Sequence, residues 1–410
     1  GLLLLPQEAP VGTDFRRYFE LDDSIFTLSL TPNRADCLGV LGVAREVSAI
    51  SATALSVLQI KPVPHEIDDA LDVHIRAIDA CPLYSGRIIR NINADVPTPL
   101  WLTQRLERSG IRSINAVVDI TNYVLLETGQ PMHAFDLATI NGAIQVRYAS
   151  SQEKLLLLNG MEIELAEDML VIADDQEPLA LAGIMGGSKS GVTQGTTDIF
   201  LESAFFAPAV ISGKSFRLGF NSDSAYRFER GVDFAATRAA LERATYLIQS
   251  ICGGRVGVVT EVKHQLPQRL PINVRMSRIQ RVLGIDISRQ QISDYFGWLG
   301  MQCSVQADTF QVIPPTYRFD LTIEEDMIEE IARIYGYDQI PAHSPRASLT
   351  MLPASEKLQS PLNFKNALVM RDYPEVINSA FVNAEWERDF GNADPIALKN
   401  PIASQMSVMR

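Results

Sequence analysis

Between residues 121 and 136 a helical pattern starts and then stops within a few residues. Apolar side chains recur at helical spacing until Gly129 and Pro131 interrupt them. A helix that ends here is expected to present Asn122 and His133 near a turn, which is a common way to line a pocket. A single histidine after a proline turn is more often a packed or capping residue, so the stretch alone does not establish a site.

The length of 410 residues is too great for one hydrophobic core and predicts two to four domains. With 46% hydrophobic and 21% charged residues, the composition is that of an ordinary globular protein. No apolar run reaches the ~20 residues that span a bilayer, and the opening GLLLLP lacks the basic flank of a signal peptide. Because the chain starts with Gly and ends inside a patterned stretch, both ends are expected to be cut from a longer polypeptide.

A formal charge of -13 and a pI near 5.0 argue against a general nucleic-acid binder, since phosphate affinity needs dense Lys and Arg contacts. A nucleic-acid ligand would have to be held locally or largely by a partner. The four cysteines lie far apart without a C-x-x-C pair. This spacing excludes the common zinc motifs and indicates a reducing, cytoplasmic location.

Pattern changes along the chain predict an α+β, multidomain fold with four segments. Residues 1–65 contain a predicted strand at 25–30 and an apolar helix after residues 33–36, and residues 66–265 mix short strands with two clear helices. Residues 267–342 read as strand, helix, helix, strand, strand and helix, an order that often resembles a winged helix. Residues 343–410 open with a helix and a strand.

An acidic cluster is the first candidate for chemistry. Its members are Asp320, Asp326, Glu329 and Glu330. The last three are spaced i, i+3 and i+4, which places them on one helical face. Converging carboxylates could hold Mg²⁺. The alternative is a solvated acidic face without a metal, and the spacing alone favours this alternative.

Glu202 is the second candidate, because it is an acid within the apolar run FLESAFF. If buried, it needs a partner or carries a raised pKa, and a buried acid that faces a ligand hydroxyl would select strongly for that hydroxyl. On a strand it could equally point to water. The glycine-rich loop 182–191 fits no nucleotide-binding motif, and no nucleophilic serine or cysteine motif is present. The remaining polar set is Asn122, His133, Glu202 and the segment 221–230.

Four long motifs occur in a fixed order along the whole chain: SLTPNRADCLGVLGVAREV, VVDITNYVLLETGQPMHAFD, SDSAYRFERGVD and YRFDLTIEEDMIEEIARIYGYDQIP. Together they resemble the family of bacterial phenylalanyl–tRNA synthetase β subunits. The resemblance implies that the tRNA-binding OB domain and the C-terminal part of the family are missing here. It further implies a B3/B4-type tRNA editing domain at 66–265, a B5 winged-helix-like domain at 267–342, and the start of a non-catalytic class II synthetase-like antiparallel domain at 343–410.

The same resemblance implies an editing pocket that hydrolyses tyrosine wrongly esterified to tRNA(Phe). Its residues would be Thr121, Asn122, Pro131, His133, Ala182, Gly183 and Glu202. Glu202, helped by the backbone of Gly183, would recognise the tyrosine hydroxyl, and His133 with Asn122 would position the ester and the attacking water. Ser222 and Ser224 stand where relatives often have Thr and Ala, so the sieve is expected to differ slightly.

The resemblance also implies partners and cofactors. Asp320, Asp326, Glu329 and Glu330 would hold a Mg²⁺ ion shared with an α subunit, which itself would bind ATP and carry out aminoacylation in an α2β2 heterotetramer. Phenylalanine, tyrosine and tRNA(Phe) would be the ligands. Two alternatives remain: a non-catalytic assembly or tRNA-docking module with a relict pocket, and an unrelated hydrolase, for which no nucleophile or metal triad is found.

Overall fold

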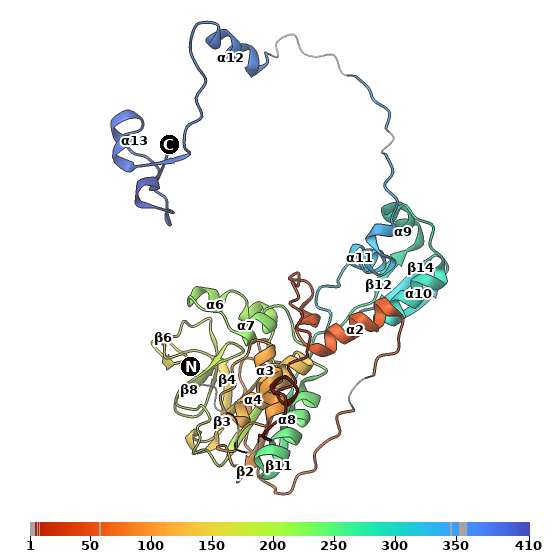
Figure 1. Cartoon of the computed structure of the whole chain (residues 1–410), viewed down its shortest axis with the longest axis vertical. Coiled ribbons are helices and arrows are strands. Elements are labelled where there is room, and N and C mark those ends of the chain that lie inside the picture. Colours follow the sequence, from red (N-terminus) through yellow and green to blue (C-terminus); the bar gives the residue numbers. More distant parts are fainter. Residues whose placement is uncertain (1–4, 6, 8, 57–58, 345–346, 352–358) are drawn as a thin grey trace. The chain divides into compact units, whose positions relative to one another are not determined.

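The computed structural model describes residues 5, 7, 9–56, 59–344, 347–351 and 359–410. The chain divides into two compact units, Gly1–Ala342 and His343–Arg410 (Figure 1). In the described part of the chain, no helix is both long and apolar enough to cross a lipid bilayer. All four cysteines carry free thiols.

The start of the first unit contains the helices α1 (Phe15–Tyr18), η1 (Ala35–Cys37) and α2 (Val40–Ser51) among its described residues. The helix predicted after residues 33–36 is therefore confirmed. The strand predicted at 25–30 is wrong, because this segment pairs with no other strand in the described structure and leaves Ile25 and Phe26 exposed. An apolar run without a pairing partner leaves its backbone groups to water.

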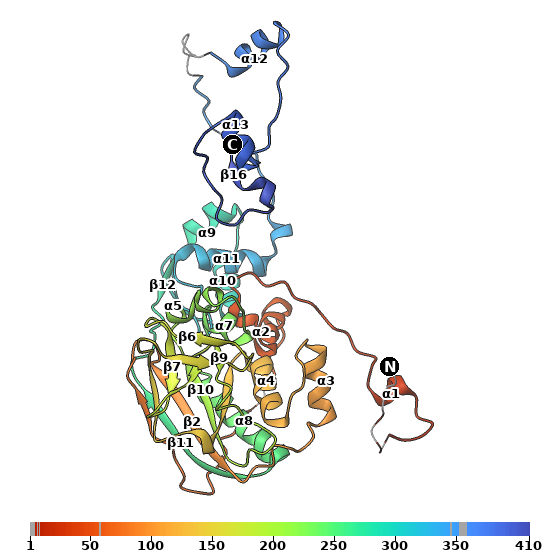
Figure 2. The same ribbon diagram turned by 90° about the vertical axis from the view of Figure 1, so that its left-hand side faces the viewer.

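A four-stranded sheet forms the centre of the first unit, in the order β11 (Arg255–Lys263), β2 (Leu83–Arg90), β10 (Ile199–Phe205) and β3 (Met132–Asp136). The helices α4 (Ala116–Thr128) and α8 (Thr237–Cys252) cover one face of it, and α3 (Leu100–Arg108) packs against α4 (Figure 2). All seven residues of β10 are buried, since Ile199 and Leu201 pack toward these helices while Phe200 and Ala204 pack on the other face. Residues two apart on a strand share a face, so Glu202 lies on the face away from the helices.

A second, five-stranded sheet packs on that other face. Its order is β1 (Val73–Ile75), β4 (Ile144–Tyr148), β7 (Leu170–Ala173), β8 (Pro178–Leu181) and β9 (Met185–Gly186). The strands β5 (Lys154–Leu156) and β6 (Glu162–Glu164) form a hairpin, and the short helices are η2 (Leu137–Thr139), α5 (Pro208–Ile211), α6 (Lys214–Arg217) and α7 (Asp223–Phe228). One apolar core joins the two sheets, with Phe135 and Phe200 from the first sheet and Leu170 and Ile172 from the second.

The last part of the first unit follows the predicted order of elements. It contains β12 (Ile272–Arg275), α9 (Met276–Leu283), α10 (Arg289–Trp298), β13 (Gln302–Gln306), β14 (Thr309–Ile313), α11 (Glu324–Tyr335) and η3 (Tyr337–Gln339). The three strands pair antiparallel in the order β12, β14, β13, and α9, α10 and α11 share a separate core with them. The chain is thus a mixed α/β protein with several sheets.

The second unit contains α12 (Pro361–Val369), β15 (Phe381–Val382), α13 (Ala384–Phe390), η4 (Ser404–Met406) and β16 (Val408–Met409). The helix and strand predicted here are present, and β15 pairs antiparallel with β16.

Candidate functional site

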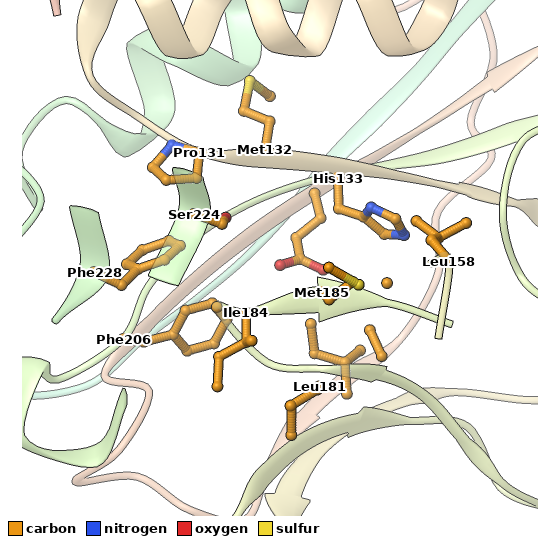
Figure 3. Close-up of a pocket in the computed structure, with 15 residues that line it drawn as sticks. Pro131, Met132, His133, Leu158, Leu181, Ile184, Met185, Phe206, Ser224 and Phe228 are labelled. Carbon is orange, nitrogen blue, oxygen red and sulfur yellow. The ribbon is translucent and has the colours of Figure 1, made fainter. Parts of the chain in front are cut away.

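A pocket of about 180 Å³ lies where the two sheets and the helix α7 meet (Figure 3). Most of its wall is apolar, and two ionisable side chains, His133 and Glu202, interrupt that wall. The lining residues are Pro131, Met132, His133, Leu158, Ile172, Ala180, Leu181, Gly183, Ile184, Met185, Gly186, Glu202, Phe206, Ser224 and Phe228. An apolar cavity with a few polar groups is the usual form of a small-ligand site.

The end of α4 brings His133 to this pocket. Asn115 caps the start of the helix, because its side chain accepts a hydrogen bond from the Val118 amide at 3.0 Å. Gly129 ends it in the left-handed region, with φ of 82°, which favours glycine. Pro131 then directs the chain into β3, so the predicted break in the helix is confirmed.

Strand pairing places His133 opposite Glu202. In the antiparallel register of β3 and β10, these two residues are direct partners, and directly opposed side chains lie on the same face of a sheet. The sequence could not predict this pairing, because 68 residues lie between His133 and Glu202 and no local pattern fixes the register of their strands.

The His133 ring is held in apolar surroundings. It packs edge-on against Phe135 with ring centroids 4.4 Å apart, and Leu158 lies beside it (Figure 3). Although the residue as a whole is half-buried, its Nε2 atom is shielded from solvent and has no hydrogen-bond partner among the described residues. Burial lowers the pKa of His133 to about 4, so the imidazole is neutral at pH 7.

Glu202 is buried on the neighbouring strand, with 5% of its surface exposed. Its Oε2 accepts a hydrogen bond of 3.0 Å from the hydroxyl of Tyr84 on β2. Burial raises the pKa of Glu202 to about 8, against the opposing effect of the Tyr84 hydrogen bond. At pH 7 the pocket therefore holds a protonated carboxyl beside a neutral imidazole, and both groups can exchange protons or hydrogen bonds with a ligand.

Gly186 makes room for the histidine ring. A Cβ at this position would lie 2.4 Å from His133 Cε1 and 2.8 Å from Nε2. We expect Gly186→Ala to displace the ring, to destabilise the chain by about 1–3 kcal/mol, and to return the imidazole pKa toward its ordinary value. Thermal unfolding and an NMR titration of the imidazole measure both effects.

Gly297→Ala is the matched control for this substitution. A Cβ on Gly297 meets no atom within 4 Å and the residue lies in the helix α10. Alanine in a helix interior stabilises by roughly 0.5–1 kcal/mol relative to glycine, so the control has the opposite sign. An unchanged stability and an unchanged imidazole pKa in Gly186→Ala would contradict the expected crowding.

Models of three protein families match separate parts of the chain. The one described as "B3/4 domain" matches residues 80–253, "tRNA synthetase B5 domain" matches 272–337, and "Phenylalanyl tRNA synthetase beta chain CLM domain" matches 340–410. The first of these ranges contains the pocket.

Curated relatives match the chain from end to end. The phenylalanine–tRNA ligase beta subunit of Nitrosospira multiformis is 58% identical, that of Chromobacterium violaceum 54% and that of Dechloromonas aromatica 53%.

The chain belongs to the phenylalanine–tRNA ligase beta-subunit family. Each of the three alignments covers 100% of this chain and 52% of the relative, so the chain spans about half the length of the curated relatives that it matches. A solved N-terminal fragment of the phenylalanyl-tRNA synthetase beta-subunit from Pyrococcus horikoshii has a TM-score of 0.37 and 15% identity, over 77% of this chain and 90% of that chain.

The pocket brings together part of the residue set expected from the family. Five expected residues line it: Pro131, His133, Gly183, Glu202 and Ser224. Four do not line it: Thr121, Asn122, Ala182 and Ser222. The roles that the family resemblance implies for all nine stay predictions.

The four residues outside the lining have other surroundings. The Thr121 hydroxyl donates to the Val118 carbonyl within α4 at 2.7 Å, and Asn122 is half-buried on the same helix. Ala182 is buried behind the lining, beside Gly183. Ser222 caps α7 and donates to the Ile184 carbonyl at 2.7 Å, so it anchors the wall that carries Ser224.

Sequence reasoning missed the walls of the pocket and the partner of Glu202. Phe206 and Phe228 form a T-shaped pair with ring centroids 5.0 Å apart (Figure 3). Tyr84 is fully buried behind Glu202. Apolar wall residues carry the same sequence signal as core residues, so only the fold separates the two groups.

The four carboxylates expected to bind magnesium do not converge on one point. Asp320 and Glu330 both bind the buried Arg318, at 2.8 and 2.6 Å, and Glu329 is exposed. Asp326 accepts hydrogen bonds from two amides at the start of α11. No group of three or more potential ligand residues forms a metal site within the described residues. The predicted convergence is therefore wrong for this chain by itself, and the magnesium ion shared with an α subunit stays a prediction.

Two of them, Asp320 and Glu330, instead belong to an ion-pair network around the buried Arg318. Arg333 pairs with Glu330 at 2.6 Å and with Glu46 on α2 at 2.5 Å. Glu46 in turn binds Arg34 at 2.6 Å. The network fastens the segment containing α2 to the segment containing α11.

Proposed function

We propose that this chain forms part of the β subunit of a phenylalanine–tRNA ligase and that its pocket hydrolyses tyrosine wrongly attached to tRNA(Phe). In this proposal an α subunit binds ATP and attaches phenylalanine to tRNA, in an α2β2 complex that the β chain helps to assemble. The membership of the chain in the beta-subunit family supports the assembly role. The observation that carries the editing role is the buried carboxyl of Glu202, which lies with His133 in a mostly apolar pocket.

Tyrosine differs from phenylalanine by one hydroxyl, and the pocket contains a group suited to recognising it. The Glu202 carboxyl uses Oε2 to accept from Tyr84, and its other oxygen has no hydrogen-bond partner in the described residues. A tyrosine hydroxyl would complete the hydrogen bonding of this carboxyl, whereas a phenylalanine ring would leave a buried polar group unpaired. Such an unpaired group costs about 1–3 kcal/mol, so tyrosine would be selected.

Hydrolysis of the ester requires an attacking water near the aminoacyl bond. His133 is the candidate to orient this water or to accept its proton, because a neutral imidazole has one nitrogen free to accept. The proton would pass from the water to the imidazole and then to the departing ribose oxygen. The terminal ribose of the tRNA could supply part of the catalysis, and Asn122 would act with His133 only if the bound ester reaches α4.

Glu202→Ala tests the recognition role. We expect the ratio of kcat/KM for tyrosyl-tRNA(Phe) to that for phenylalanyl-tRNA(Phe) to fall by about 10- to 100-fold, because one hydrogen bond to the hydroxyl is lost. The hydrolytic rate on bound ester should fall much less. Deacylation of both substrates by the full α/β complex containing this β sequence measures these quantities.

Glu202→Gln is the matched control, since it keeps the size of the side chain and one hydrogen-bonding oxygen and should retain part of the selectivity. Equal loss of rate and selectivity in Glu202→Ala would contradict a recognition role. If neither the unaltered complex nor its variants release tyrosine, the pocket is a relict and the chain serves only assembly or tRNA docking.

A further inference from the structure

One hydrogen bond connects the pocket to a residue that cannot touch a ligand. Tyr84 is completely buried, yet its hydroxyl donates to Glu202 Oε2 at 3.0 Å. We propose that Tyr84 is a positioning residue, whose hydroxyl fixes the Glu202 carboxyl so that its second oxygen meets the phenolic hydroxyl of a bound aminoacyl group. This inference rests on the proposed editing function and deepens it.

Strand register explains how Tyr84 reaches Glu202. On β10, Glu202 pairs with Gly86 of β2, and Ala204 pairs with Tyr84. Directly paired residues share a face, and Glu202 and Ala204 share a face because they are two apart. Tyr84 therefore extends along the same face as Glu202, one diagonal step away, which is within reach of an aromatic side chain.

The tyrosine ring is held by packing and not by the ligand. It stacks on Phe200 with ring centroids 6.5 Å apart and an interplanar angle of 11°. The Phe200 ring occupies the space beside Gly86, where a Cβ would lie 2.1 Å from its Cζ atom. Because this stack lies in the core between the two sheets, the hydroxyl of Tyr84 has a fixed position before any ligand binds.

A fixed donor on one oxygen restricts how the carboxyl can turn. Without it, a buried carboxyl would rotate toward whichever partner lowered its energy, and the oxygen facing the ligand would no longer have a defined direction. Selection for a hydroxyl depends on that direction, because hydrogen bonds weaken steeply when they are misaligned. The Tyr84 hydroxyl is therefore expected to affect selectivity more than ester hydrolysis.

Three ionisable groups among the described residues surround the Glu202 carboxyl. Tyr84 donates to it from β2, His133 opposes it from β3, and the buried thiol of Cys81 lies close enough for the Glu202 charge to raise the thiol pKa beyond the effect of burial. Of these, the Tyr84 hydrogen bond lowers the Glu202 pKa, in opposition to burial. Loss of the hydroxyl should therefore move the ionisation of Glu202 to higher pH.

The experiment compares tyrosyl- and phenylalanyl-tRNA(Phe) deacylation by the full α/β complex between pH 6.5 and 9, corrected for uncatalysed hydrolysis. An ionised Glu202 accepts from a phenol more strongly and repels an apolar ring, so selectivity for tyrosine should rise as Glu202 ionises. Tyr84→Phe is expected to reduce this selectivity about tenfold at pH 7.5 and to move its pH midpoint upward. In a Glu202→Ala background, Tyr84→Phe should have no further effect on selectivity, because no carboxyl is left for Tyr84 to position.

Tyr123→Phe is the matched control. Tyr123 is also buried and its hydroxyl is also hydrogen-bonded, to Glu127 and Arg105, but it lies in the core on the helical side of the sheet. This control should leave both the selectivity and its pH midpoint unchanged.

The possible results separate the two proposals. If the unaltered complex releases no tyrosine, the editing function and this inference both fail. If it releases tyrosine but Tyr84→Phe keeps the selectivity and midpoint, or adds its full effect to that of Glu202→Ala, only the inference fails. If Tyr84→Phe does not fold, replacement of the tyrosines by 3-fluorotyrosine keeps the hydroxyl and makes it a stronger donor. The midpoint must then move to lower pH, and an unchanged midpoint overturns the inference.

Discussion

Glu330→Gln is expected to lower the free energy of unfolding by about 3 kcal/mol, because it removes one charge from a buried ion-pair network. Arg318 and Glu330 are each 2% exposed, and the Arg318 Nη1 atom lies 2.6 Å from Glu330 Oε2. The substituted glutamine has no charge to balance Arg318 and Arg333. Asp320 still pairs with Arg318, which places the expected loss at the lower end of the range for a broken buried pair.

The pH dependence of this effect has a definite sign. Burial by itself would raise the pKa of Glu330, but hydrogen bonds from Arg333 and Arg318 outweigh burial and lower it to about 2. A carboxyl with a depressed pKa contributes stability that is present above its unfolded value, near 4.5, and is lost as the pH falls toward 2. The unaltered chain should therefore lose stability over this range, and Glu330→Gln should lose less.

Urea unfolding monitored between pH 3 and pH 7 measures both the loss and its pH dependence. Asp308→Asn is the matched control in the same part of the chain, because the Arg289–Asp308 pair is exposed on both sides. Exposed pairs contribute about 0–1 kcal/mol, so this control should change little. Equal effects of the two substitutions would show that the buried network contributes no more than a surface pair.

The same network shows why the sequence could not predict whether the four carboxylates converge on one magnesium site. The spacing of Asp326, Glu329 and Glu330 places them near one another on a helix, but it does not state which of them faces the core. In the structure Glu330 is buried and Glu329 is exposed. Arg318, two residues before Asp320, forms buried ion pairs with Asp320 and Glu330. The pair with Glu330 depends on how α11 packs against the sheet, which the sequence pattern does not give.

The pocket shows a similar limit. Local signals at Gly129 and Pro131 were sufficient to predict where α4 ends, since those residue types restrict the backbone directly. The apolar neighbours of Glu202 were sufficient to pose the question of its burial. Its pairing with His133 and its hydrogen bond with Tyr84 depend on the register of three strands, and register is a property of the whole sheet.

His133→Ala is expected to reduce the deacylation of tyrosyl-tRNA(Phe) by about 100-fold or more, the typical effect of losing a positioned acid–base group. The reason is geometric: His133 is the imidazole of the pocket, opposite Glu202 in register. The measurement is single-turnover deacylation by the full α/β complex, with aminoacylation as the internal reference. His74→Ala is the matched control, since His74 lies exposed on β1 and should leave deacylation unchanged.

The pH dependence of deacylation and of stability tests the role of His133 independently. Burial lowers its pKa to about 4, so deacylation by the unaltered complex should not decline between pH 7.5 and 6, as it would with a histidine of ordinary pKa near 6.5. The unfolded chain binds this proton below pH 6.5, whereas the folded chain resists it until about pH 4. The histidine therefore costs about 3 kcal/mol of stability as the pH falls through that window, and His133→Ala should abolish the cost. If His133→Ala still loses stability in acid and still releases tyrosine at the unaltered rate, the acid–base group lies elsewhere. If the variant is no longer destabilised by acid and also releases tyrosine much more slowly, both effects belong to the imidazole that follows the end of α4.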